Sequence, residues 1–222
     1  MNRLLIALAL AWAWGLCLSP SSAQAQQKFV VIKLAERKVA ELPPGPLYWR
    51  IETFTWGLAG SGVDEYGNEV PGALEQAKAA AGPWSLVAEA EGQVWLFTLG
   101  APGGASAGAT KVAEVGPISR VVAKEYLLRV NEGSGPPGSA TTVHSHPGSE
   151  AFYVLSGETS SRTPRGVMRV AAGHFAAGNV ADTPMQVSSS GSTDLRSLVM
   201  FVVDAERPFS ARATLPTSQA QR

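Results

Sequence analysis

The chain has 222 residues, of which 45% are hydrophobic and 16% are charged. Its 18 basic residues balance 18 acidic ones, so the chain lacks the positive charge that binding to a phosphate backbone requires, and nucleic acid is excluded as an expected partner. This apolar content also excludes a wholly disordered chain. The 23 glycines and 15 prolines favour many short elements joined by turns, and therefore a β protein.

The N-terminal segment has the three parts of a secretory signal peptide. A single positive charge at Arg3 precedes an uncharged apolar run over residues 4–18, and an Ala-x-Ala site ends at Ala25. The run is shorter than the roughly 20 apolar residues that a membrane-spanning helix needs. The segment predicts cleavage after Ala25, a bacterial periplasmic or secreted location, and no membrane attachment of the mature chain.

Cys17 suggests an alternative, because bacterial lipid anchors attach to a cysteine that follows such an apolar run. The residue before it is Leu16, whereas that processing prefers a small side chain. Cleavage after Ala25 would remove the only cysteine of the chain. The mature protein would then have neither a disulfide nor a thiolate metal ligand.

Residues 26–115 are expected to form a strand-rich N-terminal segment. Aromatic and β-branched runs predict strands at 29–34, 47–54, 84–91, 93–99 and 111–115. Residues 57–72 are rich in glycine and predict a loop, and the alanine-rich stretch 73–81 predicts one short helix. Whether this segment is a degenerate copy of the second half or an extension of it stays open.

Residues 116–210 show only strand and turn signals. Short strand-like segments recur at regular spacing, which predicts an antiparallel sandwich or barrel. They lie at 121–130, 141–146, 151–155, 166–170, 185–188 and 195–203. The polar tail 211–222 is expected to be flexible.

The histidines carry the clearest chemical signal. All three, His144, His146 and His174, lie in the second half of the chain. Because side chains alternate along a strand, the imidazoles of His144 and His146 should project from the same face. A turn at Pro147 would bring Glu150 onto the adjacent strand, facing the same interior. Two imidazoles and one carboxylate form a facial triad that suits one divalent ion such as Fe, Mn or Zn.

The spacing of these residues resembles the first signature of the cupin superfamily. Its five fixed positions are occupied by Gly138, His144, His146, Glu150 and Gly157. Cupins are small antiparallel β-barrels of jelly-roll type, and the His, His and Glu of this signature usually bind a divalent metal. The resemblance therefore implies an all-β, cupin-type barrel with additional N-terminal strands, and a metal site at these three residues.

The second cupin signature does not match. Counted from Gly173, that pattern has Pro, Gly, His and Asn at positions where this chain has Asn179, Ala181, Pro184 and Ser188. The usual third histidine ligand is therefore missing. If Pro184 occupies its place, Asp182 and Gln186 share the parity of that position and offer oxygen donors, and Gln186 is the expected fourth ligand.

The resemblance leaves three functions open. The first is a metal-dependent enzyme, of oxygenase type, acting on a small molecule. The second is a non-enzymatic module that binds or senses a metal or a small molecule. The third is a metal-free isomerase with a histidine as base, but no carboxylate is placed to partner His174. An enzyme would need a further polar group at the barrel mouth, for which Arg129, Thr142 and Tyr153 are the candidates. A homodimer also stays open.

Overall fold

The computed structural model describes residues 28–54, 62–63 and 69–216. The predicted signal peptide and most of the predicted loop 57–72 lie outside these residues. No helix among the described residues is long and apolar enough to cross a membrane.

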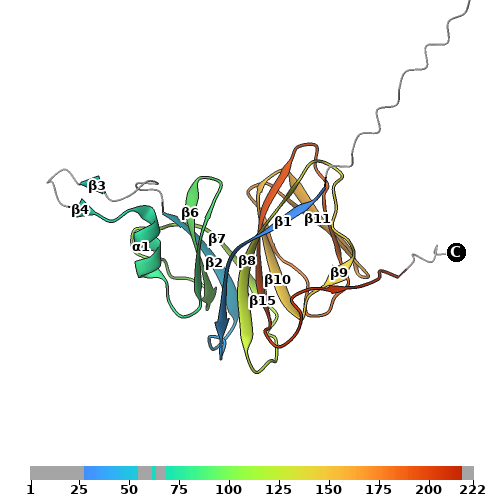
Figure 1. Cartoon of the computed structure of the whole chain (residues 1–222), viewed down its shortest axis with the longest axis horizontal. Helices are drawn as coiled ribbons and strands as arrows, with labels where there is room; N and C mark the ends of the chain where they lie inside the picture. Colours follow the sequence, from blue (N-terminus) through green and yellow to red (C-terminus); the bar gives the residue numbers. More distant parts are fainter. Residues whose placement is uncertain (1–27, 55–61, 64–68, 217–222) are drawn as a thin grey trace, which may run out of the picture.

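The second half of the chain, together with one strand from its first half, forms an antiparallel barrel (Figure 1). Its largest sheet has five strands, in the order β1 (Val30–Val39), β8 (Tyr126–Gly135), β15 (Leu195–Asp204), β10 (Gly148–Ser156) and β13 (Phe175–Ala177). A three-stranded sheet has the order β12 (Gly166–Ala171), β11 (Glu158–Thr163) and β14 (Gln186–Ser189). A two-stranded sheet pairs β16 (Ala211–Arg212) with β9 (His144–Ser145).

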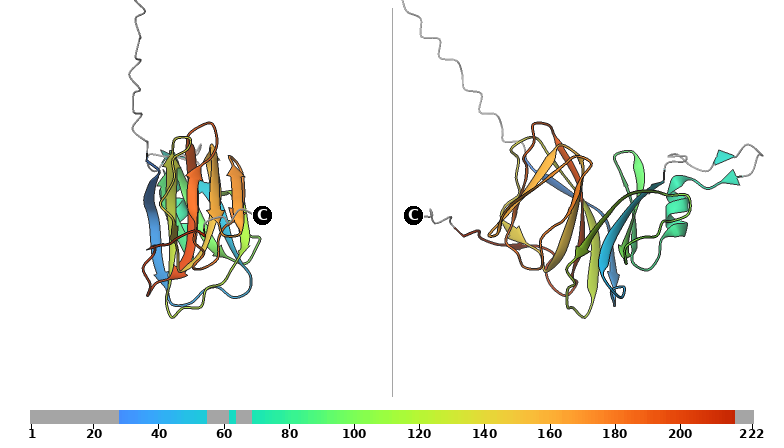
Figure 2. Two further views of the ribbon diagram at one scale, coloured as in Figure 1. Left: turned by 90° about the vertical axis from the view of Figure 1, so that its right-hand side faces the viewer. Right: turned by 180° about the vertical axis from the view of Figure 1, so that it is seen from behind.

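A four-stranded antiparallel sheet covers the outside of this barrel. It has the order β5 (Ser85–Ala90), β6 (Gln93–Gly100), β2 (Leu47–Phe54) and β7 (Thr110–Ile118). The single α-helix, α1 (Ala73–Ala80), packs on this sheet, and the short strands β3 (Gly62–Val63) and β4 (Glu69–Val70) pair with each other. Seen from behind, the helix and the C-terminal segment lie on opposite sides of the molecule (Figure 2).

The five-stranded sheet is the central layer, and its two faces have different roles. Leu128, Val130, Leu198 and Met200 form one face and pack in a common core with aromatic and aliphatic side chains of the four-stranded sheet. Because side chains alternate along each strand, Asn131 on β8 and the intervening residues of β10 and β15 face the barrel interior. The barrel interior is thus lined by the face of the sheet that carries the polar residues of the site.

Several predicted elements match their observed bounds. The strand expected at 47–54 is β2, and the predicted short helix is α1. The strands predicted at 84–91 and 93–99 are β5 and β6, which form a hairpin through Glu91 and Gly92, with φ values of 51° and 69°. Two consecutive left-handed residues produce the tight turn whose twist matches a hairpin.

The expected division of the chain at residues 115 and 116 differs from the structure in three places. Strand β1 belongs to the barrel, because it pairs with β8 from Val30 opposite Ser134 to Val39 opposite Tyr126. Strand β7 runs across the expected boundary. The tail is ordered at its start, since Ala211 pairs with Ser145. The free edges of β8 and β9 supply the backbone partners that hold both segments against the barrel.

Candidate functional site

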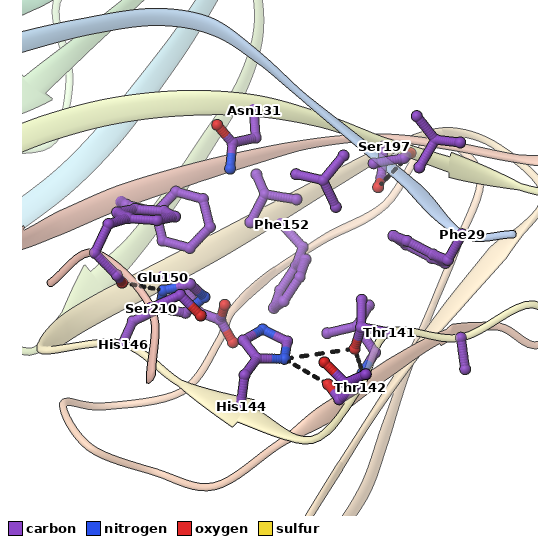
Figure 3. A pocket seen from close by; sticks show the side chains of 18 of the residues that line it. Phe29, Asn131, Thr141, Thr142, His144, His146, Glu150, Phe152, Ser197 and Ser210 are labelled. Atoms are coloured by element: carbon purple, nitrogen blue, oxygen red, sulfur yellow. Dashed lines mark hydrogen bonds between the residues drawn. The ribbon is translucent and has the colours of Figure 1, made fainter. Parts of the chain in front are cut away.

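The two histidines of the His-x-His motif lie side by side at one end of the barrel. His144 and Ser145 form β9, and both imidazoles line the same cavity, with ring centroids 5.0 Å apart. Figure 3 shows them beside Glu150. The two-residue period of an extended chain produces this arrangement, as the sequence predicts.

His146 is enclosed by aromatic rings. It is 5% exposed, and its ring centroid lies 4.8 Å from that of Phe201 and 4.7 Å from that of Phe209. Burial lowers the pKa of His146 to about 4, although its hydrogen bond to Phe209 acts in the opposite direction. The imidazole is therefore neutral at physiological pH, which is the form that binds metal ions.

Backbone carbonyls fix the same tautomer in both rings. His146 Nδ1 donates to the carbonyl of Phe209 over 2.6 Å, and His144 Nδ1 donates to the carbonyl of Thr142 over 2.8 Å. A carbonyl only accepts, so each Nδ1 must carry a proton, and in the neutral form of each ring the lone pair is on Nε2. Metal-binding histidines are commonly oriented by such a bond from their other nitrogen.

Glu150 lies on β10 and faces the interior, as its parity with Phe152 predicts. It is 3% exposed, and its Oε1 accepts a hydrogen bond from Asn179 Nδ2 over 2.6 Å. Burial raises the pKa of Glu150 to about 7, while the bond from Asn179 opposes this rise. A buried carboxylate without a paired cation is costly, so the site favours either a proton or a positive ion at this position.

The three residues open into a cavity of about 640 Å³. Its walls are mainly aromatic and aliphatic, with a few hydroxyl and amide groups (Figure 3). Besides the three residues, the lining consists of Lys28, Phe29, Val30, Val31, Asn131, Gly133, Ala140, Thr141, Thr142, Phe152, Val187, Ser197, Val199, Phe201, Phe209 and Ser210. This size and mixture suit a small, largely apolar molecule.

The donor set fits a divalent ion in its chemistry. Two imidazoles that bind through Nε2 in their neutral form, together with a buried carboxylate, are the ligands that Fe, Mn and Zn accept. In this structure, no group of three His, Cys, Asp or Glu side chains in the described part of the chain has the geometry to hold a metal ion. His144, His146 and Glu150 are the residues that would hold it.

The structure places the expected fourth ligand, Gln186, outside this cavity. Gln186 Nε2 donates to the carbonyl of Thr141 over 3.1 Å, and its Oε1 accepts from Arg162 over 3.1 Å. The alternative, Asp182, is exposed and forms a two-point ion pair with Arg207, at 2.6 and 3.0 Å. Both amide atoms of Gln186 and both carboxylate oxygens of Asp182 are therefore already bonded elsewhere.

The side chains around Gln186 face the opposite way from the sequence prediction, in which residues 182, 184 and 186 face the interior of the barrel. His144 forms an antiparallel bridge with Met185, and Val187, rather than Gln186, lines the cavity. Met185 is 1% exposed, and its Sδ accepts a contact from Asn179 Nδ2 at 3.4 Å. The two apolar side chains turn inward and the amide turns outward, because burial of Met185 and Val187 is the more favourable arrangement. Met185 therefore lies opposite His144, one residue beyond the place counted from Gly173.

Of the other polar residues that the sequence offers as candidates, one lines the cavity and the rest lie outside it. Thr142 lines the cavity, and Arg129 lies behind it, over the ring of Phe209. Tyr153 packs beside Trp95 in the core between the two sheets. His174 is exposed, and its Nδ1 bonds the carbonyl of Ala172.

Two residues of the site have no role in the sequence prediction. Asn179 is noted there only as a departure from the second signature, although a polar residue in place of a proline is itself a signal of changed chemistry. Phe209 has no such signal, because it reaches the site from a segment more than 60 residues beyond His146.

No protein-family model matches the chain, and no curated protein matches it. Among solved structures, DMSP lyase DddQ from Ruegeria pomeroyi DSS-3 is 19% identical, over 40% of this chain and 45% of its own, with a TM-score of 0.34. A cupin-like protein from Thermotoga maritima msb8 is 17% identical, over 41% of this chain and 68% of its own, with a TM-score of 0.34. An uncharacterized protein with a double-stranded β-helix domain from Klebsiella pneumoniae is 24% identical, over 39% of this chain and 75% of its own, with a TM-score of 0.33.

These likenesses cover about two fifths of this chain and less than half of the DMSP lyase chains. At such identities and TM-scores they indicate nothing about activity. The antiparallel barrel and the first-signature residues at its mouth are observations of this chain itself. The described part of the chain contains an antiparallel β-barrel, and the solved structures to which it is similar include a cupin superfamily protein and a cupin-like protein.

Proposed function

We propose that this protein is a metal-dependent cupin that takes a small, largely apolar molecule into the cavity beside His144, His146 and Glu150, and that it acts as an oxygenase-type enzyme. One observation carries the proposal. Both imidazoles donate Nδ1–H to a carbonyl, which leaves Nε2 for a metal, next to a buried carboxylate that forms no ion pair with any described residue. Hydrogen-bonded histidines of purely structural role have no need of this shared tautomer.

A bound divalent ion would supply Lewis acidity or an electron, with open positions for a substrate oxygen, dioxygen or water. The chain's own residues prepare the site for this chemistry. Asn179 orients the carboxylate of Glu150, and the carbonyl of Phe209 orients the ring of His146. The rings of Phe201 and Phe209 exclude water from one side of His146.

A second candidate function is a non-enzymatic binding module. Among the described residues that line the cavity, Lys28 is the only titratable side chain besides the three candidate ligands. An enzyme that needs a separate acid or base is therefore disfavoured, whereas binding alone and chemistry at the ion itself remain. A metal-free isomerase with His174 as base is disfavoured, because His174 is exposed and does not line the cavity.

Metal analysis of the purified protein tests the proposal. We expect one divalent ion per chain, lost in the double variant His144→Ala/His146→Ala and retained in the control His174→Ala, whose ring is exposed. Equal metal content in the double variant and the wild type would place the ion elsewhere. A wild-type protein that binds no Fe, Mn or Zn after incubation with each ion would overturn the proposal.

Oxygen consumption separates the enzyme from the binding module. The protein would be loaded with Fe(II) without air and then mixed with air-saturated buffer and a panel of small phenols, alcohols and ketones. Consumption above that of the double histidine variant supports the oxygenase. Raised thermal stability with a panel member, without consumption, supports binding alone.

We also propose that the protein is exported. The support is the three-part N-terminal segment ending at Ala25. The intact mass of the protein recovered from its native host tests this: it should begin at Gln26. A recovered chain that retains residues 1–25, or one that carries a lipid on Cys17, would contradict the proposed processing.

A further inference from the structure

Asn131 forms part of the cavity wall. It belongs to β8, the strand between β1 and β15, where its backbone pairs with Lys33 on one side and Val199 on the other. The residue is 2% exposed and lines the cavity. In Figure 3 its amide nitrogen points into the cavity, above the aromatic rings and the two histidines.

Arg129 fixes the orientation of this amide. It precedes Asn131 by two residues on the same face of β8, and its Nε donates to Asn131 Oδ1 over 2.8 Å. Arg129 is itself held by the ring of Phe209, 4.1 Å from its guanidinium carbon, and by Glu36 at 3.6 Å. Because a guanidinium only donates, the oxygen of the amide must face Arg129, and the NH2 group must face the cavity.

The amide nitrogen has no hydrogen-bond partner among the described residues. Of the hydrogen bonds formed among the described residues, the one from Arg129 is the only side-chain bond of Asn131. Because this nitrogen borders the cavity and is not sealed from it, water or a ligand in the cavity can satisfy it, as nearly all polar groups inside proteins are satisfied. Ser197, whose hydroxyl also lines the cavity, donates to the carbonyl of Gly133 over 3.1 Å, and no hydrogen bond joins its side chain to that of Asn131.

The surroundings define what an occupant would look like. Phe152, Val199 and Phe201 line the same region of the cavity and offer only apolar contacts. An occupant that satisfies the amide therefore needs a hydrogen-bond acceptor on an otherwise apolar, compact body. A carbonyl oxygen meets this requirement, because it accepts without bringing a donor or a negative charge into an apolar wall.

We propose that Asn131 is the specificity-determining residue of the cavity, and that its NH2 group binds the carbonyl oxygen of a small, apolar ligand beside the two histidines. The proposal rests on the proposed function for the location of the ligand, and it adds the substrate class. Arg129 is the positioning residue for this contact.

A matched pair of probes tests the contact. Acetophenone carries a carbonyl on an apolar body, and ethylbenzene has the same carbon skeleton without the oxygen. Their dissociation constants would be measured by NMR titration for the wild type, for Asn131→Leu and for the control Ser197→Ala. Leucine keeps the branched shape of the side chain and removes the donor.

We expect Asn131→Leu to weaken acetophenone binding about three- to tenfold, the range for one net hydrogen bond. Ethylbenzene should bind this variant as well as the wild type or more tightly. Ser197→Ala should leave the ratio of the two dissociation constants unchanged. Asn131→Asp is the second variant, because its carboxylate retains the bond from Arg129 and repels a carbonyl oxygen; it should weaken acetophenone as well.

Three results would overturn the proposal: no binding of acetophenone by the wild type, an equal loss for both probes in Asn131→Leu, or no loss for either. The metal content of the same samples keeps the two proposals separable. If the wild type binds no metal and Asn131→Leu still weakens the binding of acetophenone, the metal site alone is refuted. A protein with one ion per chain and no effect of Asn131 on the probes refutes the role of Asn131 alone.

Discussion

Asn179 donates its side-chain amide to Glu150 Oε1 over 2.6 Å, from a position where the second cupin signature has a proline. The same nitrogen lies 3.0 Å from Ser161 Oγ and 3.4 Å from Met185 Sδ. The backbones of the two residues are also joined, since Glu150 N donates to the carbonyl of Asn179 over 3.2 Å. A buried carboxylate is thus held in one orientation by a residue that replaces a proline of the family pattern.

Replacing Asn179 with leucine should weaken metal binding. The variant removes the donor that orients Glu150 and leaves its carboxylate without this partner, so we expect metal affinity to fall about tenfold or more, the usual effect of losing a group that orients a ligand. The free energy of unfolding should fall by about 1–3 kcal/mol. Competition with a chelator and denaturant unfolding measure the two effects.

Ser161→Ala is the matched control for this variant. It removes only a neighbour of the Asn179 amide and leaves the bond to Glu150 intact, so metal affinity should change by less than about threefold. Equal affinities of Asn179→Leu and the wild type would show that Asn179 has no part in holding the carboxylate.

Introducing a histidine at position 185 should tighten metal binding, whereas one at position 186 should not. Met185 lies opposite His144 on the inner side of the barrel, while the side chain of Gln186 bonds to Thr141 and Arg162. We expect Met185→His to raise affinity by about tenfold, as an added imidazole ligand would, and Gln186→His to leave it unchanged. Titration of the apo-variants with Zn measures both.

The opposite ranking, with Gln186→His the tighter binder, would restore the ligand assignment derived from the sequence. Circular dichroism of both variants would show whether each retains the β-barrel, since Met185 is buried and its replacement disturbs packing.

The sequence predicts the central elements of the fold because their patterns are local. Strand β2 and helix α1 are recognised from side chains within a single window, and the His-x-His motif and Glu150 follow from alternation along two adjacent strands. Pairings between distant segments leave no such pattern. The partnership of β1 with β8 joins residues about 100 positions apart, so composition places β1 with its neighbours in the chain instead of with the barrel.

Strand β11 shows a second cause of failure. Its sequence, Glu158–Thr163, is polar throughout and gives no strand signal, yet Thr159 and Ser161 are each 1% exposed. Neighbours in the folded barrel bury these hydroxyl groups, and Asn179 bonds one of them. The assignment of Gln186 differs from the structure because it is counted along the chain from Gly173. Met185, one position beyond the counted place, lies opposite His144. A shift of one residue reverses the face of every following side chain in a strand.

In metal-free protein, replacing Glu150 with glutamine should raise stability at high pH. The pKa of Glu150 is raised from the ordinary value of 4.5 to about 7. Between these two pH values the folded state therefore binds more protons than the unfolded state. The free energy of unfolding falls as pH rises through this window. Glutamine avoids this cost and still accepts a bond from Asn179. Metal-free Glu150→Gln should therefore be more stable than the metal-free wild type at pH 8, by about 2–3 kcal/mol.

The advantage should shrink as pH falls and disappear below pH 4.5, where the wild-type carboxyl group becomes protonated in both states. His146 contributes with the opposite sign in both proteins, since its pKa is lowered to about 4 and stability falls as pH drops below 6.5. Thermal unfolding from pH 4 to 8, in the presence of chelator, measures the difference. A constant difference across this range would contradict the buried, cation-free carboxylate.

Removing the ring of Phe209 should raise the pKa of His146. This ring and that of Phe201 pack on the imidazole, and burial is the main cause that lowers its pKa to about 4. In metal-free Phe209→Ala, water reaches the imidazole, so its pKa should move towards the ordinary value of 6.5. NMR titration of the histidine ring signals, assigned with His144→Ala and His174→Ala, measures the change. Phe175→Ala, which removes a ring that is 48% exposed, should leave the pKa of His146 in place. An unchanged pKa of about 4 in Phe209→Ala would show that the barrel alone shields His146, and that the C-terminal segment does not control water access to the site.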